Sequence, residues 1–157
     1  MKTVGPAIVQ VNSSPTTASG LLIEGNYVVT AAHVVWPASH VTVIVSEGSN
    51  YPDMPVLGWD LLADIAVIGP VDTIAAPFEL SNVADPQVGD AVFALGHMTV
   101  RGVKISAGQI IPNRKDNLIG IRAIASNLEL VPGQSGGVVT NESGQFVGVI
   151  SLLDFVD

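Results

Sequence analysis

The chain has 157 residues, of which 48% are hydrophobic and 13% are charged, and its formal net charge is −8. This length fits one domain, or two small halves that share a core. Six basic residues against fourteen acidic ones argue against nucleic acid as a partner and against a polybasic membrane contact. Cysteine is absent, which excludes disulfides and thiolate metal ligands.

The N-terminus runs directly into a strand-like segment and lacks the apolar stretch of a signal peptide. No apolar run is long enough to span a bilayer. The sequence therefore leaves the compartment open between a cytoplasmic protein and an excised domain whose targeting segment was removed.

Short apolar runs separated by Gly, Pro, Asn and Asp dominate the sequence, and a helical period is almost absent. The runs predict six strands in the first half, at residues 7–11, 20–23, 27–31, 41–45, 55–59 and 65–71, with a hairpin turn at 24–26. They predict five strands in the second half, at residues 91–95, 103–111, 118–124, 137–140 and 145–153. Residues 73–86 carry no period and are predicted to link the halves. The pattern indicates an all-β fold of two packed barrels or a large sandwich.

His33 directly follows an apolar strand, at the point where the chain leaves the sheet. Imidazole changes its protonation state near neutral pH, so a histidine held rigidly there can transfer protons in catalysis. For an isolated histidine, capping of the strand end is the alternative interpretation.

Asp64 opens a strongly apolar strand, so we expect its carboxylate to be partly buried and to need a partner such as a histidine N–H. A turn aspartate is the alternative interpretation. Asp60 lies nearby but does not abut the strand, which favours Asp64.

Residues 131–139 (VPGQSGGVV) place Ser135 among glycines, immediately before an apolar strand. Because glycine permits tight and left-handed turns, backbone N–H groups can converge on one point in such a loop. Acyl transfer needs a nucleophilic hydroxyl beside donors that stabilise an oxyanion. Ser135 is the candidate nucleophile, and the N–H groups of Gly133 and Ser135 are the candidate donors. Taken alone, the motif also fits an ordinary turn.

Histidine, aspartate and serine in this order, each at the edge of a β-run, resemble the chymotrypsin/trypsin-like serine peptidases, and within them the HtrA/Deg-like bacterial branch. Residues 5–11, 18–23, 88–96 and 144–151 are similar to further segments of that branch. The resemblance implies two packed antiparallel β-barrels of the chymotrypsin type in a single peptidase domain, with barrels at about 1–72 and 87–157.

The resemblance also implies a serine endopeptidase that cleaves polypeptides through an acyl-enzyme intermediate. Ser135 would be the nucleophile, His33 the general base and acid, and Asp64 the residue that orients His33. Gly133 and Ser135 would form the oxyanion hole. No cofactor is expected, and no metal either, because the remaining histidines lack further ligands at a recognisable spacing.

Substrate-binding residues follow from the same resemblance. Ser151 would begin the strand that pairs with an extended substrate, with Leu152 and Leu153 beside the specificity pocket. Glu129 stands where the family places the base of that pocket. An acidic residue there suggests that the substrate residue at the cleavage site is basic. Leu153 stands where a small glycine often keeps the pocket open, which weighs against this specificity.

The chain stops 22 residues after Ser135, before the point where the family pattern has a last strand in the second barrel. We therefore expect that strand to be missing and its place to be taken by an additional domain or a second copy in a homo-oligomer. Members of the branch are often trimeric and exported. A catalytically silent or conditionally active peptide-binding domain of the same fold is the alternative function, and a viral processing protease is a third hypothesis.

Overall fold

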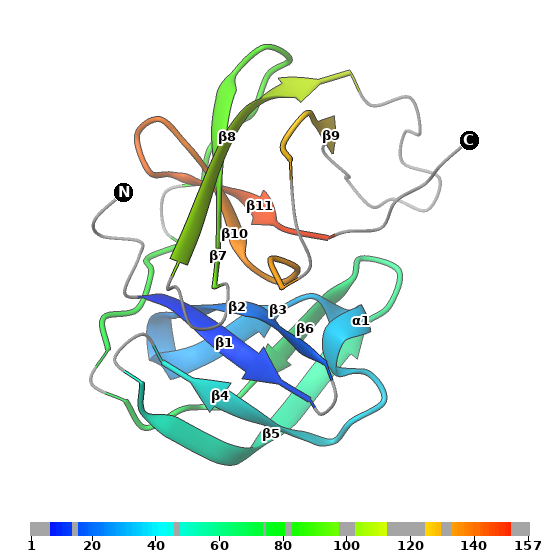
Figure 1. Ribbon diagram of the computed structural model, residues 1–157, viewed down its shortest axis with the longest axis vertical. Helices are drawn as coiled ribbons and strands as arrows, with labels where there is room; N and C mark the ends of the chain where they lie inside the picture. Colours follow the sequence, from blue (N-terminus) through cyan, green and yellow to red (C-terminus); the bar gives the residue numbers. More distant parts are fainter. Residues whose placement is uncertain are drawn as a thin grey trace.

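A computed structural model of the chain describes residues 7–13, 16–45, 48–73, 75–80, 83–97, 103–112, 125–129 and 133–151. Within these ranges the chain forms eleven strands and one short α-helix, arranged as two β units stacked one above the other (Figure 1). This arrangement confirms the all-β, two-part fold predicted from the sequence.

The first six strands close into an antiparallel barrel in the order β1-β2-β3-β6-β5-β4. Their bounds are Ile8–Asn12 (β1), Thr17–Ile23 (β2), Tyr27–Thr30 (β3), His40–Ile44 (β4), Asn50–Asp60 (β5) and Ile65–Ile68 (β6). Burial alternates along β4 and β6, as expected for strands with one face on a core. At the predicted hairpin turn, Gly25 and Asn26 have φ angles of 82° and 65°, so both occupy left-handed backbone that these residue types tolerate.

The other five strands form an antiparallel sheet in the order β11-β10-β7-β8-β9. Their bounds are Ala91–His97 (β7), Val103–Ile111 (β8), Ala125–Ser126 (β9), Val138–Asn141 (β10) and Phe146–Val149 (β11). The strand predicted at 118–124 lies outside the described residues. Among those that are described, no helix is long and apolar enough to cross a membrane.

The two units share one hydrophobic core. Leu95 of β7 and Val138 of β10 are direct cross-strand partners, and both are fully buried in the cluster that fills the first barrel. The opposite face of the second sheet has a smaller cluster of Val92, Ile110 and Val147. One face of the second sheet therefore packs on the barrel.

Helix α1 (Ala32–Val35) follows β3 and is pinned by the buried side chains of Ala32, Val34 and Val35. The next residue, Trp36, meets Trp59 near the end of β5 edge-on, with ring centroids 6.4 Å apart. Both indole rings are about half exposed. The contact ties the end of the helix to the end of the longest strand of the barrel.

Candidate active site

His33 and Asp64 meet through two hydrogen bonds. The backbone N–H of His33 donates to Asp64 Oδ1 at 2.8 Å, and Nδ1 of the ring lies 2.7 Å from Asp64 Oδ2. The carboxylate is 3% exposed whereas the imidazole is 40% exposed. A carboxylate only accepts, so Nδ1 carries the proton and Nε2 of the neutral ring is left as an acceptor. The ring therefore has a fixed orientation, and its Nε2 has no hydrogen-bond partner among the described residues.

The turn before β6 explains why Asp64 rather than Asp60 reaches the histidine. Asp60 Oδ1 accepts hydrogen bonds from the backbone N–H groups of Leu62 and Ala63, at 3.0 and 3.2 Å, and thereby shapes the turn. Asp64 ends the turn with a φ of 57°, a left-handed conformation that aspartate adopts more readily than most residues. Asp60 therefore supports the turn, and Asp64 contacts the imidazole, as the sequence favoured.

The loop that carries Ser135 is held by the first barrel. The backbone N–H of Ser19 in β2 donates to the Ser135 carbonyl at 2.9 Å, and Ser19 Oγ donates to the Gly133 carbonyl at 2.6 Å. Ser19 is fully buried and Ser135 is 6% exposed. One residue of the first unit therefore binds the loop of the second unit at two points, a role that the sequence did not predict for Ser19.

Gly136 brings this loop against the segment that leads to His33. Its φ is +87°, and a Cβ atom there would lie 2.0 Å from the Ser19 carbonyl oxygen and 3.1 Å from the backbone nitrogen of Ala31. Ala31 directly precedes helix α1, the element that holds His33. Only glycine fits this approach, so the glycine of the serine motif sets the spacing between the two units.

The structure brings His33 and Asp64 together and places Ser135 on the neighbouring loop. Within the described part of the chain, no hydrogen bond joins Ser135 to the His33 ring. The N–H groups of Gly133 and Ser135 likewise donate to no described residue. Gly133 has a φ of +97°, and a Cβ atom there would meet no described atom within 4 Å.

Ser151 extends the contacts of Asp64. Its hydroxyl donates to Asp64 Oδ2 at 2.5 Å, so this carboxylate oxygen receives hydrogen bonds from two side chains. The sequence predicted Ser151 as the start of a substrate-pairing strand and gave no sign of this side-chain contact. Leu152 and Leu153 lie outside the described residues.

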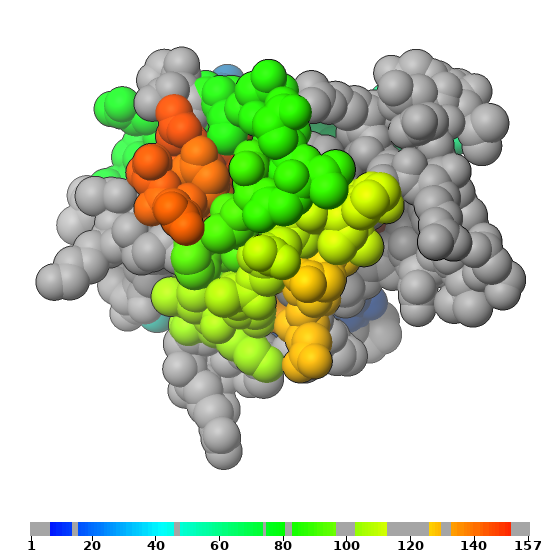
Figure 2. Space-filling model, turned by 90° about the horizontal axis from the view of Figure 1, so that it is seen from above, coloured from blue at the N-terminus to red at the C-terminus, as the bar shows by residue number. Residues whose placement is uncertain are grey.

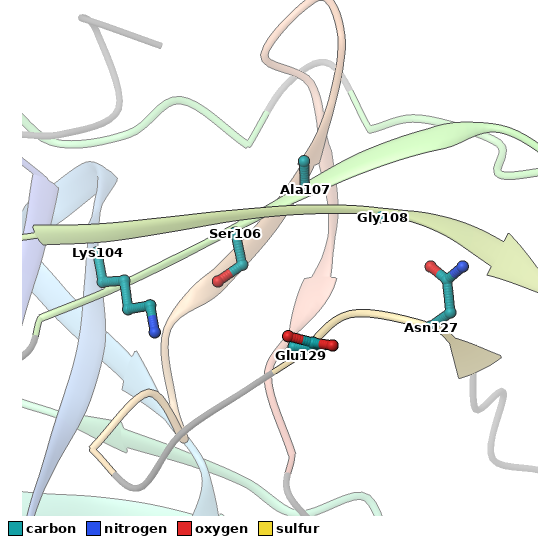
Figure 3. A pocket seen from close by; sticks show the side chains of 6 residues that line it. All are labelled: Lys104, Ser106, Ala107, Gly108, Asn127 and Glu129. Carbon is teal, nitrogen blue, oxygen red and sulfur yellow. The ribbon is translucent and has the colours of Figure 1, made fainter.

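Glu129 lines a pocket of about 420 Å³ on the second sheet, and its other lining residues are Lys104, Ser106, Ala107, Gly108 and Asn127. In the space-filling view, residues 125–129 (gold) lie against β8 (yellow-green) at the surface (Figure 2). Lys104 and Ser106 project from β8 toward the segment that carries Glu129 (Figure 3). The sequence predicted only Glu129 at this pocket and did not indicate Lys104. No three His, Asp or Glu side chains of the described ranges are grouped so as to hold a metal ion.

Comparison with known proteins identifies the class. The family model for the trypsin-like peptidase domain matches residues 18–149, so the chain belongs to this family. This confirms the sequence-based assignment to the trypsin-like peptidases, and the relatives below have names of the Deg type, in line with the branch that the sequence resembles.

Three relatives place the chain beside Deg-type endoproteases. It is 28% identical to a probable periplasmic serine endoprotease DegP-like of Pseudomonas fulva, over 86% of this chain and 29% of the relative. It is 30% identical to the DegP-like protein of Chlamydia trachomatis, over 82% of this chain and 26% of the relative. Serine endoprotease DegS of Haemophilus influenzae is 27% identical over 85% of this chain and 41% of the relative. The chain thus spans less than half the length of these relatives.

Proposed function

We propose that this chain cleaves polypeptides as a serine endopeptidase, with Ser135 as nucleophile, His33 as general base and acid, and Asp64 as the residue that orients His33. The observation that carries the proposal is the two-point contact between the buried Asp64 carboxylate and His33, beside the loop of Ser135. Nε2 would accept the Ser135 proton during attack on the peptide carbonyl and would then donate it to the leaving amine. Water would then attack the acyl-enzyme while Nε2 accepts its proton, and that proton would return to Ser135 as the acyl group leaves.

The backbone N–H groups of Gly133 and Ser135 are proposed to stabilise the tetrahedral oxyanion. Neither donates to a described residue, and the Ser19 hydroxyl holds the Gly133 carbonyl. Hydrogen bonds from Ser19 to the Gly133 and Ser135 carbonyls would keep these two donors in place during the reaction. Removing one such donor in related chemistry costs about 10²–10³-fold in turnover.

An extended substrate is proposed to pair with the backbone at Ser151, with Leu152 and Leu153 beside it. The Ser151 side chain is already used by Asp64, so recognition there would rest on main-chain hydrogen bonds, which are independent of substrate sequence. Side-chain selection would then fall to the pocket that contains Glu129.

A conditionally active domain is the second candidate, and one observation favours it: no hydrogen bond joins Ser135 to the His33 ring. Catalytic hydrogen bonds are often long before substrate binds and tighten in the complex. In this version, the same residues act only after substrate or a partner chain brings the serine onto Nε2.

Reaction of the purified chain with a fluorophosphonate probe, read by intact mass beside Ser135→Ala, tests both candidates. A single adduct that is lost in the variant supports the active peptidase. An adduct that forms only after a peptide is added supports the conditional domain. If no adduct forms under either condition, the assignment of Ser135 as nucleophile is wrong.

A further inference from the structure

The pocket at Glu129 contains opposite charges that do not neutralise each other by direct contact. Lys104 and Glu129 are both exposed, and neither side chain has an ion pair or hydrogen bond to a described residue. Lys104 is the only Lys or Arg within the described ranges, and the chain has five further Lys and Arg residues outside them. The Lys104 ammonium group supplies positive charge to a pocket that also contains the Glu129 carboxylate.

The register of β7 and β8 links Lys104 of this pocket to the segment that precedes Ser135. Lys104 is the direct partner of Gly96, so both residues face the same side of the sheet. A Cβ atom on Gly96 would lie 2.8 Å from Cγ of Gln134, which puts the Gln134 side chain on that side as well. Gln134 directly precedes Ser135, so the β7 partner of Lys104 lies against the residue before the candidate nucleophile.

The remaining lining residues offer uncharged hydrogen-bonding groups. Asn127 Oδ1 accepts from the backbone N–H of Gln109 at 2.7 Å, and its amide NH₂ group donates to no described residue. The Ser106 hydroxyl projects from β8 on the same side as Lys104 (Figure 3). Gly108 leaves room for Asn127, since a Cβ there would lie 2.7 Å from Asn127 Oδ1. The pocket thus contains donors and acceptors in addition to its two charges.

We infer that Lys104 is a specificity-determining residue: its ammonium group offsets the Glu129 carboxylate, so that the pocket selects neutral, hydrogen-bonding side chains such as those of glutamine and asparagine. This inference rests on the proposed peptidase function and deepens it. Glu129 alone would favour lysine and arginine, whereas among the described lining residues the charges of Lys104 and Glu129 offset each other. Removing the Lys104 charge should therefore shift the preference toward basic side chains, and removing the Glu129 charge should shift it toward acidic ones.

The test uses the Ser135→Ala chain, so that peptides bind without being cleaved. Three peptides that differ only in one residue before the scissile bond (Gln, Lys or Glu) compete with a labelled peptide, and affinity is read by fluorescence anisotropy. We expect the Gln peptide to bind best. Lys104→Met should raise the affinity for Lys relative to Gln by about tenfold, and Glu129→Gln should raise that for Glu by a similar factor, as for one charge acting across an exposed pocket.

Two controls change net charge by the same amount outside the pocket: Gln87→Glu matches Lys104→Met, and Glu142→Gln matches Glu129→Gln. Both positions are exposed and absent from the pocket lining. A shift below threefold in the pocket variants, or an equal shift in the controls, overturns the inference. Probe labelling of the Ser135 chain is measured separately, so a failure of catalysis is distinguished from a failure of the pocket assignment.

Discussion

Replacing Asp64 by asparagine removes one charge and preserves the shape of the side chain. Asp64 Oδ1 accepts the His33 backbone N–H, and Oδ2 accepts both Nδ1 of the ring and the Ser151 hydroxyl. An amide can keep only one of these two positions as an acceptor. If its oxygen stays on the backbone N–H, its NH₂ group faces Nδ1 and the ring must take the other tautomer. Nε2 then carries the proton and cannot accept one from Ser135.

We expect Asp64→Asn to lower peptide turnover by about 10⁴-fold, the size of effect known for this substitution in the serine peptidase triad. Stability should change much less. The substitution leaves at least one buried donor without its acceptor, which costs about 1–3 kcal/mol, or roughly 2–12 °C in Tm for a chain of this size. Initial rates of peptide hydrolysis and thermal unfolding by circular dichroism separate the two effects.

Asp60→Asn is the matched control. The amide oxygen of asparagine can still accept from Leu62 and Ala63, so activity should stay within twofold of the original chain. The reasoning is refuted if Asp64→Asn keeps more than a tenth of the activity, or if Asp60→Asn loses as much as Asp64→Asn.

Three further substitutions test the junction between the units, and Gly144→Ala is a control outside it. Gly136→Ala should destabilise the fold by about 3 kcal/mol or more in a urea titration, because its Cβ would lie 2.0 Å from the Ser19 carbonyl oxygen. Gly144 has a φ of +80° but open space around it, so Gly144→Ala should lower the free energy of unfolding by only about 1 kcal/mol in the same titration. Ser19→Ala removes the donor to the loop carbonyl and should slow probe labelling about tenfold; an unchanged labelling rate would show that the loop needs no such support. Ser151→Ala leaves the histidine contacts of Asp64 in place, so peptide turnover should fall about tenfold, far less than in Asp64→Asn.

The strands were predictable where burial follows the sequence period. Residues 103–111 form β8 with the predicted bounds. Strand β5 runs over Asn50–Asp60, although the sequence predicted only 55–59. The prediction was too short because the first half of β5 has a proline, a residue with left-handed backbone (Asp53) and mostly exposed side chains. Its pairing with β4 and β6 overrides this weak local pattern.

The candidate site was predictable only in part, for a similar reason. His33 and Asp64 stand at strand ends in the sequence, and the structure brings them into contact. The contact of Ser19 with Gly133 joins residues 114 positions apart, and no local pattern indicates it. Lys104 was missed because its place beside Glu129 follows from the register of β8 with its neighbours.

The contact between Trp36 and Trp59 gives the chain a built-in optical reporter. These are its only two tryptophans, and both belong to the first barrel, beside the helix of His33. Intrinsic emission therefore follows the unfolding of that barrel alone, whereas far-ultraviolet circular dichroism follows the strands of both units. Coincident transitions would show that the shared core makes the two units unfold together, and an earlier loss of dichroism would show that the second sheet opens first.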